Sequence, residues 1–422
     1  RLLSVRAWDY LNLAQFDVGV KTAEHACELA QRLEKPGIEA LARLAWARIL
    51  SRQHKRELAL AQYEQVVALA KAAQNPILEA DGWIGIGSQI IRQVDVTPAQ
   101  EPLLRALNLC QTLLYKPGEL ETLILLGDLA LRQEAHAESV DYTERALQLS
   151  RQLADVATEA EALGSLGVIL ASRGDLAGSL SYQKEALATF RRLKMPESEQ
   201  WVLGQLGYTS IQLGDYAEAE KQLTGALVIA ERLGDEFWRA WVGLRLGEMW
   251  IQRGKSEIAL SYIIRAFETA EQLQYGNFKA AVLYGWGDLF LSQQDWANAE
   301  QKYQDAYDLR HGSGRIEEAS LALAGLAYVA CQQEKLETAT ACAEQLWQTW
   351  QASPAMAERA NLKLYWMLGM VWDGLGDSRA NDLWKQAHAL LLERSEKIPD
   401  EGLRKMFLEE VPAHRAILRV QA

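Results

Sequence analysis

Residues 165–186 read SLGVILASRGDLAGSLSYQKEA, and this stretch decides the fold because its pattern recurs along the chain. Its apolar–glycine pair, Leu166 and Gly167, has counterparts in the tetrads LLGD (125–128), QLGY (205–208), RLGE (245–248) and GWGD (285–288). The glycines stand at positions 127, 167, 207, 247 and 287, a constant spacing of forty residues. A fixed period of this length predicts stacked copies of one small unit rather than a single globular core.

The same register extends in both directions and stays occupied by small residues. Backward it meets Gly87, Ala47 and Ala7, and forward it meets Ala327 and then, after a slip of one or two residues, Leu368 and Gly369. Two more small columns follow in each unit. Twelve residues after the first stand Ala59, Ala99, Ser139, Ser179, Ala219, Ala259, Ala299 and Ala339. Seven residues further stand Ala26, Ala106, Ala146, Ala186, Ala226, Ala266 and Ala306, with Val66 and Leu346 as exceptions. Small residues let two helix backbones approach closely, so these columns predict a pair of packed helices per unit.

Turn signals separate the two expected helices of each unit. RGDL (173–176), LGDY (213–216), RGKS (253–256) and LGDS (375–378) place Gly where a helix ends in a left-handed residue, followed by Asp or Ser suited to the next N-cap. Prolines mark the connection between units: Pro36, Pro76, Pro117 and Pro196. The sequence therefore predicts an all-α protein, an α-solenoid (right-handed superhelix) of about ten helix pairs over residues 1–395 and without strands.

These elements resemble the tetratricopeptide repeat in a forty-residue form, over about residues 1–390. The third unit departs from the pattern at VDVTPAQEPLL (94–104), where Thr97 and Pro98 suit a helix start and Pro102 predicts a longer loop or a kink. The final segment, residues 396–422, breaks the register. Asp400 and Glu401 suit the first turn of a helix there, and Leu403, Met406, Phe407 and Val411 recur at helical spacing. We expect a C-terminal capping helix that covers the last unit.

The tail is similar to the one that ends tetratricopeptide arrays in bacterial STAND-class signalling ATPases and transcription regulators. That resemblance implies a C-terminal sensor region that controls an upstream nucleotide-binding domain of the same chain. The chain begins with Arg1 rather than Met, and we expect it to be part of a longer protein. Because such arrays serve many roles, the repeat itself predicts no particular ligand.

The sequence predicts neither an enzyme nor a cofactor or metal site. Its six histidines are scattered without metal-ligand spacing, and GKS (254–256) lacks the glycine of a phosphate loop five residues earlier, where Met249 stands. The net charge of −12 argues against a direct nucleic-acid partner. There is no apolar run of the ~18 residues that a membrane span needs. Four widely spaced cysteines favour a reducing, cytoplasmic location.

Candidate binding residues lie on the first helices, which line the concave surface of such an array. If the small column packs inward, the residue after it and the residue six before it face the groove. That face contains Trp201, Tyr208, Trp241, Glu248, Tyr284 and Asp288. Tyr and Trp are frequent anchors of binding surfaces, whereas Trp286, which fills the large apolar column, is assigned to the core.

A second column, Arg52, Arg92 and Arg132, stands near the ends of successive first helices. Two interpretations remain open. The arginines either complement the helix dipole and solvent, or form a ladder of guanidinium groups that captures carboxylates or phosphates. We therefore expect a partner that is a protein or a peptide, with a small-molecule inducer as another possibility. Three functions are compatible with these features: a sensor array of a signalling protein, a stand-alone scaffold for protein assembly, and a substrate-presenting region of a larger enzyme.

Overall fold

The computed structural model describes residues 2–12, 15–53, 55–91, 93, 95–352 and 361–420, and over these residues it contains helices and no strand. The described helices form ten antiparallel pairs. The first helices are α1 (Leu2–Asn12), α3 (Pro36–Arg52), α5 (Pro76–Ile90), α7 (Lys116–Arg132), α9 (Val156–Ser172), α11 (Pro196–Gln212), α13 (Glu236–Gln252), α15 (Gly276–Ser292), α17 (Ile316–Gln332) and α20 (Leu362–Leu375). The second helices are α2 (Phe16–Arg32), α4 (Arg56–Ala72), α6 (Gln100–Thr112), α8 (His136–Gln152), α10 (Leu176–Leu193), α12 (Tyr216–Leu233), α14 (Ser256–Gln272), α16 (Trp296–His311), α18 (Leu336–Ala352) and α21 (Arg379–Glu396).

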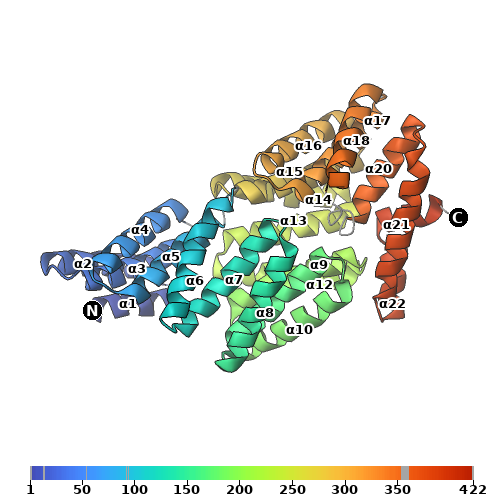
Figure 1. Ribbon diagram of the computed structural model, residues 1–422. Coiled ribbons are helices and arrows are strands. Elements are labelled where there is room, and N and C mark those ends of the chain that lie inside the picture. Colours follow the sequence, from blue (N-terminus) through green and yellow to red (C-terminus); the bar gives the residue numbers. More distant parts are fainter. Residues whose placement is uncertain are drawn as a thin grey trace. The chain divides into compact units, whose positions relative to one another are not determined.

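The chain divides into two compact units, Arg1–Thr158 and Glu159–Ala422, a division that the repeat pattern did not predict. Within each unit, helices that follow one another in the sequence pack side by side (Figure 1). Successive first helices also touch: α3 contacts α5 in the first unit, and α13 contacts α15 in the second. Each unit is thus a layered stack of helix pairs, which confirms the predicted all-α solenoid architecture.

The small columns allow the two helices of a pair to pack closely. A Cβ atom added to Gly207 would lie 2.5 Å from the Cγ atom of Leu223, and one added to Gly127 would lie 2.6 Å from the Oγ1 atom of Thr143. In each case the obstacle is the side chain sixteen residues later, on the second helix. Members of the other two columns, such as Ala259, are fully buried. The predicted role of the small residues is confirmed.

The glycine turns have the predicted backbone conformation. Gly174, Gly214, Gly254 and Gly376 have φ values of +81°, +77°, +71° and +66°, which glycine adopts without the steric penalty of a Cβ atom. The carboxylate of Asp175 accepts a hydrogen bond from the amide of Gly178 at 2.9 Å, as an N-cap does. These four turns therefore mark where α9, α11, α13 and α20 end and where their partner helices begin.

The third pair shows the expected longer connection. Helix α5 ends at Ile90, and a short 3₁₀ helix, η1 (Thr97–Ala99), precedes α6. The predicted cap by Thr97 is wrong, because the Asp95 carboxylate accepts the hydrogen bond from the Thr97 amide, at 2.9 Å. Pro102 is the third residue of α6, where no intrahelical N–H bond is lost, and α6 accommodates it.

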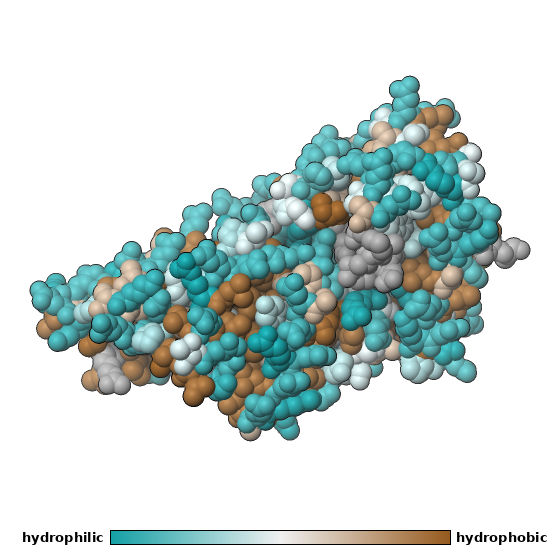
Figure 2. Space-filling view, viewed as in Figure 1, coloured by the Kyte–Doolittle hydropathy of each residue, from teal (hydrophilic) through white to brown (hydrophobic). Residues whose placement is uncertain are grey.

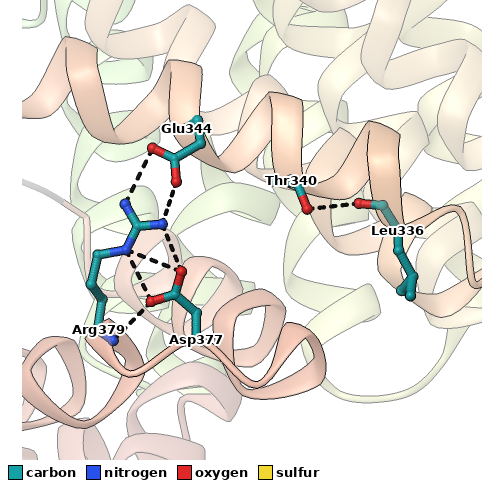
Figure 3. Close-up of polar contacts among 5 residues, drawn as sticks. All are labelled: Leu336, Thr340, Glu344, Asp377 and Arg379. Atoms are coloured by element: carbon teal, nitrogen blue, oxygen red, sulfur yellow. Dashed lines mark hydrogen bonds and ion pairs between the residues drawn. The ribbon is translucent and has the colours of Figure 1, made fainter.

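The last pair is joined to the preceding one by Arg379, at the start of α21 (Figure 3). Its guanidinium group lies between the carboxylates of Asp377 and Glu344, with its Nε atom 3.0 Å from Asp377 Oδ1 and its Nη1 atom 3.2 Å from Glu344 Oε2. Hydrogen bonds from Arg379 lower the pKa of both carboxyl groups. Thr340, one turn from Glu344, bonds only within α18, to the carbonyl of Leu336 at 2.8 Å. Arg379 therefore adds a polar link to the packing of α20 against α17 and α18.

The tail forms two short helices, α22 (Glu401–Glu409) and α23 (Pro412–Val420), instead of the single capping helix that we predicted. Pro412, which has no amide hydrogen, begins the second of them. Helix α23 packs against α20 and α21, so the tail does cover the last pair. Phe407 and Ile417 are buried, whereas Met406, predicted to contribute to the cover, is 39% exposed.

Candidate ligand-binding site

The second unit brings most of the predicted groove residues together on α11, α13 and α15. Tyr208, Trp241, Glu248, Tyr284 and Asp288 are all partly exposed there. We call the surface that they form with two further residues, Arg245 and Lys363, the first-helix face. Arg245 comes from α13 and Lys363 from α20.

Arg245 is the centre of one half of the face. Its guanidinium carbon lies 4.5 Å from the ring centre of Tyr208 and 4.9 Å from that of Trp241. Its Nη1 atom donates to both carboxylate oxygens of Glu248, at 2.8 and 2.6 Å. The Nε atom is buried and makes no hydrogen bond within the described residues. The cation therefore holds two aromatic rings and a carboxylate in fixed positions and retains one unused donor.

Asp288 organises the other half of the face. It accepts a hydrogen bond from the Tyr303 hydroxyl at 2.7 Å and forms an ion pair with Lys363 at 2.5 Å. The Lys363 ammonium group lies 4.8 Å from the ring centre of Tyr284. Burial raises the pKa of Tyr284, and Lys363, which interacts with its hydroxyl group, only partly opposes this effect. Each half thus pairs a cation with a carboxylate and with an aromatic ring.

The electrostatics of the face are those of a partly dehydrated ionic network. Burial raises the pKa of Glu248, and Asp288 raises it further, whereas Arg245 opposes both effects. Burial lowers the pKa of Lys363, but the nearby Asp288 outweighs it, and the net shift is upward. The cations therefore stay charged at neutral pH. Because opposite charges balance, the face suits a ligand with apolar and polar groups rather than a strongly charged one.

Trp201 lies apart from these contacts and packs against α9, the first helix of the preceding pair. A Cβ atom on Gly164 would lie 2.7 Å from the Trp201 ring, and one on Gly204 would lie 3.0 Å from the Trp241 ring. Each tryptophan therefore fills the space left by a glycine thirty-seven residues earlier. The two indoles contribute to packing between successive helix pairs of the second unit as well as to the exposed surface.

The arginine column lies in the first unit and is not one continuous ladder in the described residues. Arg52 is exposed at the end of α3, and Arg92 falls outside the described residues. Arg132, at the end of α7, donates from its Nε atom to both oxygens of Asp128 at 3.0 Å. This local i,i+4 pair favours the helix-terminus interpretation for Arg132. Anion capture by the column stays a prediction.

The first unit contains a buried carboxylate, Asp81, which occupies the same position in its forty-residue repeat as Trp201 and Trp241 do in theirs. It is 8% exposed and accepts a hydrogen bond from the Tyr115 hydroxyl at 3.3 Å. Burial raises the pKa of Asp81 to about 6, and Arg48 only partly opposes this effect. Perturbed carboxyl groups of this kind are frequent in functional sites and are costly for stability.

We expect Asp81→Asn to raise the free energy of unfolding of the first unit at pH 7 by about 1–3 kcal/mol. The folded-state pKa lies above the unfolded value, so the charged form costs stability above about pH 6, and the cost disappears as the pH falls below 4. Urea denaturation at pH 7 and pH 4.5 measures the effect, and the gain should shrink at the lower pH. A loss of stability at pH 7 would mean that attraction to Arg48 outweighs burial.

Other kinds of site find no support in the described parts of the chain. No group of three or more His, Cys, Asp and Glu residues is placed there to hold a metal ion. None of the described helices combines the length and apolar composition needed to cross a bilayer. The surface in view is mainly hydrophilic, with scattered apolar areas (Figure 2). The first-helix face is therefore the candidate ligand-binding site of the described residues.

Comparison with known proteins agrees with the class that the fold defines, a tetratricopeptide-repeat array. The family model of the tetratricopeptide repeat matches residues 160–193, which span α9 and α10. A search of curated proteins finds no match.

Solved structures with the same kind of fold have little sequence identity to this chain. Aspartyl phosphate phosphatase F from Bacillus subtilis is 13% identical, covers 83% of this chain and 93% of its own, and gives a TM-score of 0.52. The Rap conjugation gene regulator of plasmid pLS20, in complex with the Phr* peptide, is 13% identical, with 85% and 97% coverage and a TM-score of 0.50. A monomeric mutant of IFIT1 with m7Gppp-AAAA is 16% identical, with 91% and 79% coverage and a TM-score of 0.50. These similarities concern the fold alone.

Proposed function

We propose that this chain is a non-catalytic binding module that recognises a protein or peptide segment through the first-helix face. The observation that carries the proposal is the set of partly exposed aromatic rings of Tyr208, Trp241 and Tyr284. The cations of Arg245 and Lys363 lie over these rings and hold them in place. Such rings anchor the apolar side chains of a ligand, and the charged groups beside them offer hydrogen bonds to a peptide backbone. One structure of this fold is recorded with a peptide, which is compatible with such a ligand.

The biological setting that we propose is the sensor array of a bacterial STAND-type signalling protein, in the cytoplasm. Its support is the tail at residues 396–422, which is similar to the tails of such arrays. Ligand binding would then control a nucleotide-binding domain in the same protein, and a small-molecule inducer is the other ligand class. A stand-alone scaffold and a substrate-presenting region of a larger enzyme are the alternatives. The reading frame upstream of Arg1 separates them: an ATPase domain supports the sensor, a start codon supports the scaffold, and a catalytic domain supports the third.

Loss of an aromatic anchor is expected to weaken ligand binding by about 1–3 kcal/mol. The probe is a peptide selected against the whole chain from a random library, and its affinity is measured for Tyr208→Ala and Trp241→Ala. Trp250→Ala is the matched control, because Trp250 is a partly exposed tryptophan at the other end of α13, next to Arg253 and Lys255. Equal affinity for all three variants would place the binding site elsewhere.

A further variant, Trp286→Ala, tests which tryptophan side chains stabilise the hydrophobic core. Trp286 packs against Phe267 and Phe290 on the far side of α15, so Trp286→Ala is expected to lower the melting temperature more than Trp241→Ala. Thermal unfolding followed by circular dichroism measures both. If Trp241→Ala unfolds the chain and Trp286→Ala leaves it intact, our assignment of the face is inverted.

A further inference from the structure

The C-terminal helices of the second unit touch turns that lie about two hundred residues earlier in the chain. Helix α22 lies against the turn between α11 and α12. A Cβ atom on Gly214 would be 2.7 Å from the carbonyl oxygen of Met406 and 3.0 Å from the Cβ atom of Glu410. The Tyr216 hydroxyl lies 3.3 Å from the carbonyl oxygen of Glu410 and 2.9 Å from Gln252 Oε1. Backbone and side-chain atoms of the tail therefore contact this turn directly.

A neighbouring turn contributes a second contact. Arg394, near the end of α21, covers Gly174 in the turn between α9 and α10. A Cβ atom on Gly174 would lie 2.6 Å from Nε and 2.8 Å from Cζ of this arginine. The Nη2 atom of Arg394 is buried without a hydrogen-bond partner among the described residues. Burying a donor in this way is unfavourable, so the packing around it must compensate.

The remaining glycine turns show that this closeness is not a general property of the repeat. Gly254 occupies the same column as Gly174 and Gly214 and has a similar φ of +71°. No atom lies within 4 Å of a Cβ atom placed on it. Of these three turns, α21 and α22 thus cover two and leave the third open.

We propose that α21 and α22 form an intramolecular latch that holds the second unit closed by binding the turns at Gly174 and Gly214. The latch follows directly after α20, the helix that supplies Lys363 to the first-helix face. Release of the latch would loosen α20, which would then be held by α17 and α18 alone, and would weaken the contact between Lys363 and Asp288. The tail would then regulate access to the face, in addition to covering the last helix pair.

The glycine column offers a matched test. Gly214→Ala and Gly254→Ala carry the same backbone cost, since both positions have positive φ, but only the first places a methyl group against the tail. We expect amide hydrogen exchange in residues 401–409 to become about tenfold faster in Gly214→Ala than in Gly254→Ala, which corresponds to about 1.4 kcal/mol of lost docking energy. Tyr216→Phe, which removes only a hydroxyl group, should accelerate exchange in the same segment by a smaller factor.

The exchange pattern also tests the functional part of the proposal. If the latch controls the face, exchange at the start of α20 should rise together with exchange in α22. Equal exchange in α22 for the two glycine variants would overturn the latch. Faster exchange in α22 with no change in α20 would overturn its control of the face. Both measurements use the chain without ligand, so their failure is distinguishable from failure of the proposed binding function.

Discussion

A chain that ends at Ile398 is expected to unfold at a clearly lower temperature than the full chain, or to aggregate. Truncation removes α22 and α23, and with them Phe407 and Ile417, which are 3% and 0% exposed. Full burial of one such side chain is worth about 1.5–3 kcal/mol, so the two together predict a loss of about 3–6 kcal/mol from the second unit. The apolar surface of α20 and α21 that they cover would face water. Thermal unfolding with light scattering measures both outcomes.

Two point variants of the full chain separate loss of packing from loss of chain length. Ile417→Ala should destabilise the second unit by about 2–5 kcal/mol, as buried large-to-small substitutions do. Met406→Ala, in α22, is the matched control, because its side chain is 39% exposed and little burial is lost. A truncated chain that stays soluble with an unchanged melting curve would show that the tail is a linker or a contact for another protein.

The periodicity predicted the fold because each small column has a single steric purpose. Gly207 is small because Leu223 lies against it. Gly214 suits its positive φ, although Glu134, Gln294 and Glu334 adopt a positive φ at the same position of their repeats. The steric requirement of the small column recurs along the chain and can therefore be recognised in a single sequence. The tail was predicted less well. A helical pattern of apolar residues shows that Met406 and Phe407 are near the same face, but only the packed structure shows that α22 turns Phe407 inward and leaves Met406 exposed.

The candidate site was predicted in part for a related reason. The forty-residue register predicted that five residues share one face of neighbouring first helices: Tyr208, Trp241, Glu248, Tyr284 and Asp288. The structure brings them together. Arg245 was missed although the signal was present, since it stands four residues after Trp241 and three before Glu248, the spacing of helix-surface neighbours.

Lys363 could not be predicted from the forty-residue register, for a different reason. It lies after the point where the forty-residue register slips, and its partner Asp288 is seventy-five residues earlier in the chain. A pairing over that distance depends on how successive pairs stack, which one unit of the repeat does not encode. The Arg245 contacts are therefore local and could have been predicted, whereas the Lys363 contacts required the structure.

The second large effect that we expect is a loss of stability in mild acid that depends on His414. This histidine is 7% exposed in α23, and its Nδ1 atom lies 2.7 Å from the carbonyl oxygen of Phe407 in α22. Because a carbonyl oxygen only accepts, Nδ1 carries the proton of the neutral ring. Burial lowers the pKa of His414 to about 4, and the positive charge of Arg394 acts in the same direction, whereas the Phe407 bond partly opposes them.

The sign of the pH effect follows from this shift. The folded-state pKa lies below the unfolded value of 6.5, so the unfolded chain binds the proton more readily, and stability present above pH 6.5 is lost as the pH falls towards 4. Between pH 7 and pH 5 the loss amounts to about 2 kcal/mol from this residue. Urea denaturation across this range, with the second unit followed by hydrogen exchange in α22 and α23, measures it.

His414→Gln provides the comparison, since glutamine keeps a side-chain donor for the Phe407 carbonyl and cannot be protonated in this range. The variant should be somewhat less stable than the natural chain at pH 7, because its shape fits the Phe407 ring less well. Its stability should fall less between pH 7 and pH 5, and carboxylates elsewhere affect both chains equally. If both chains lose the same stability over this range, the imidazole is not the group that couples the tail to pH, and another titrating group is responsible.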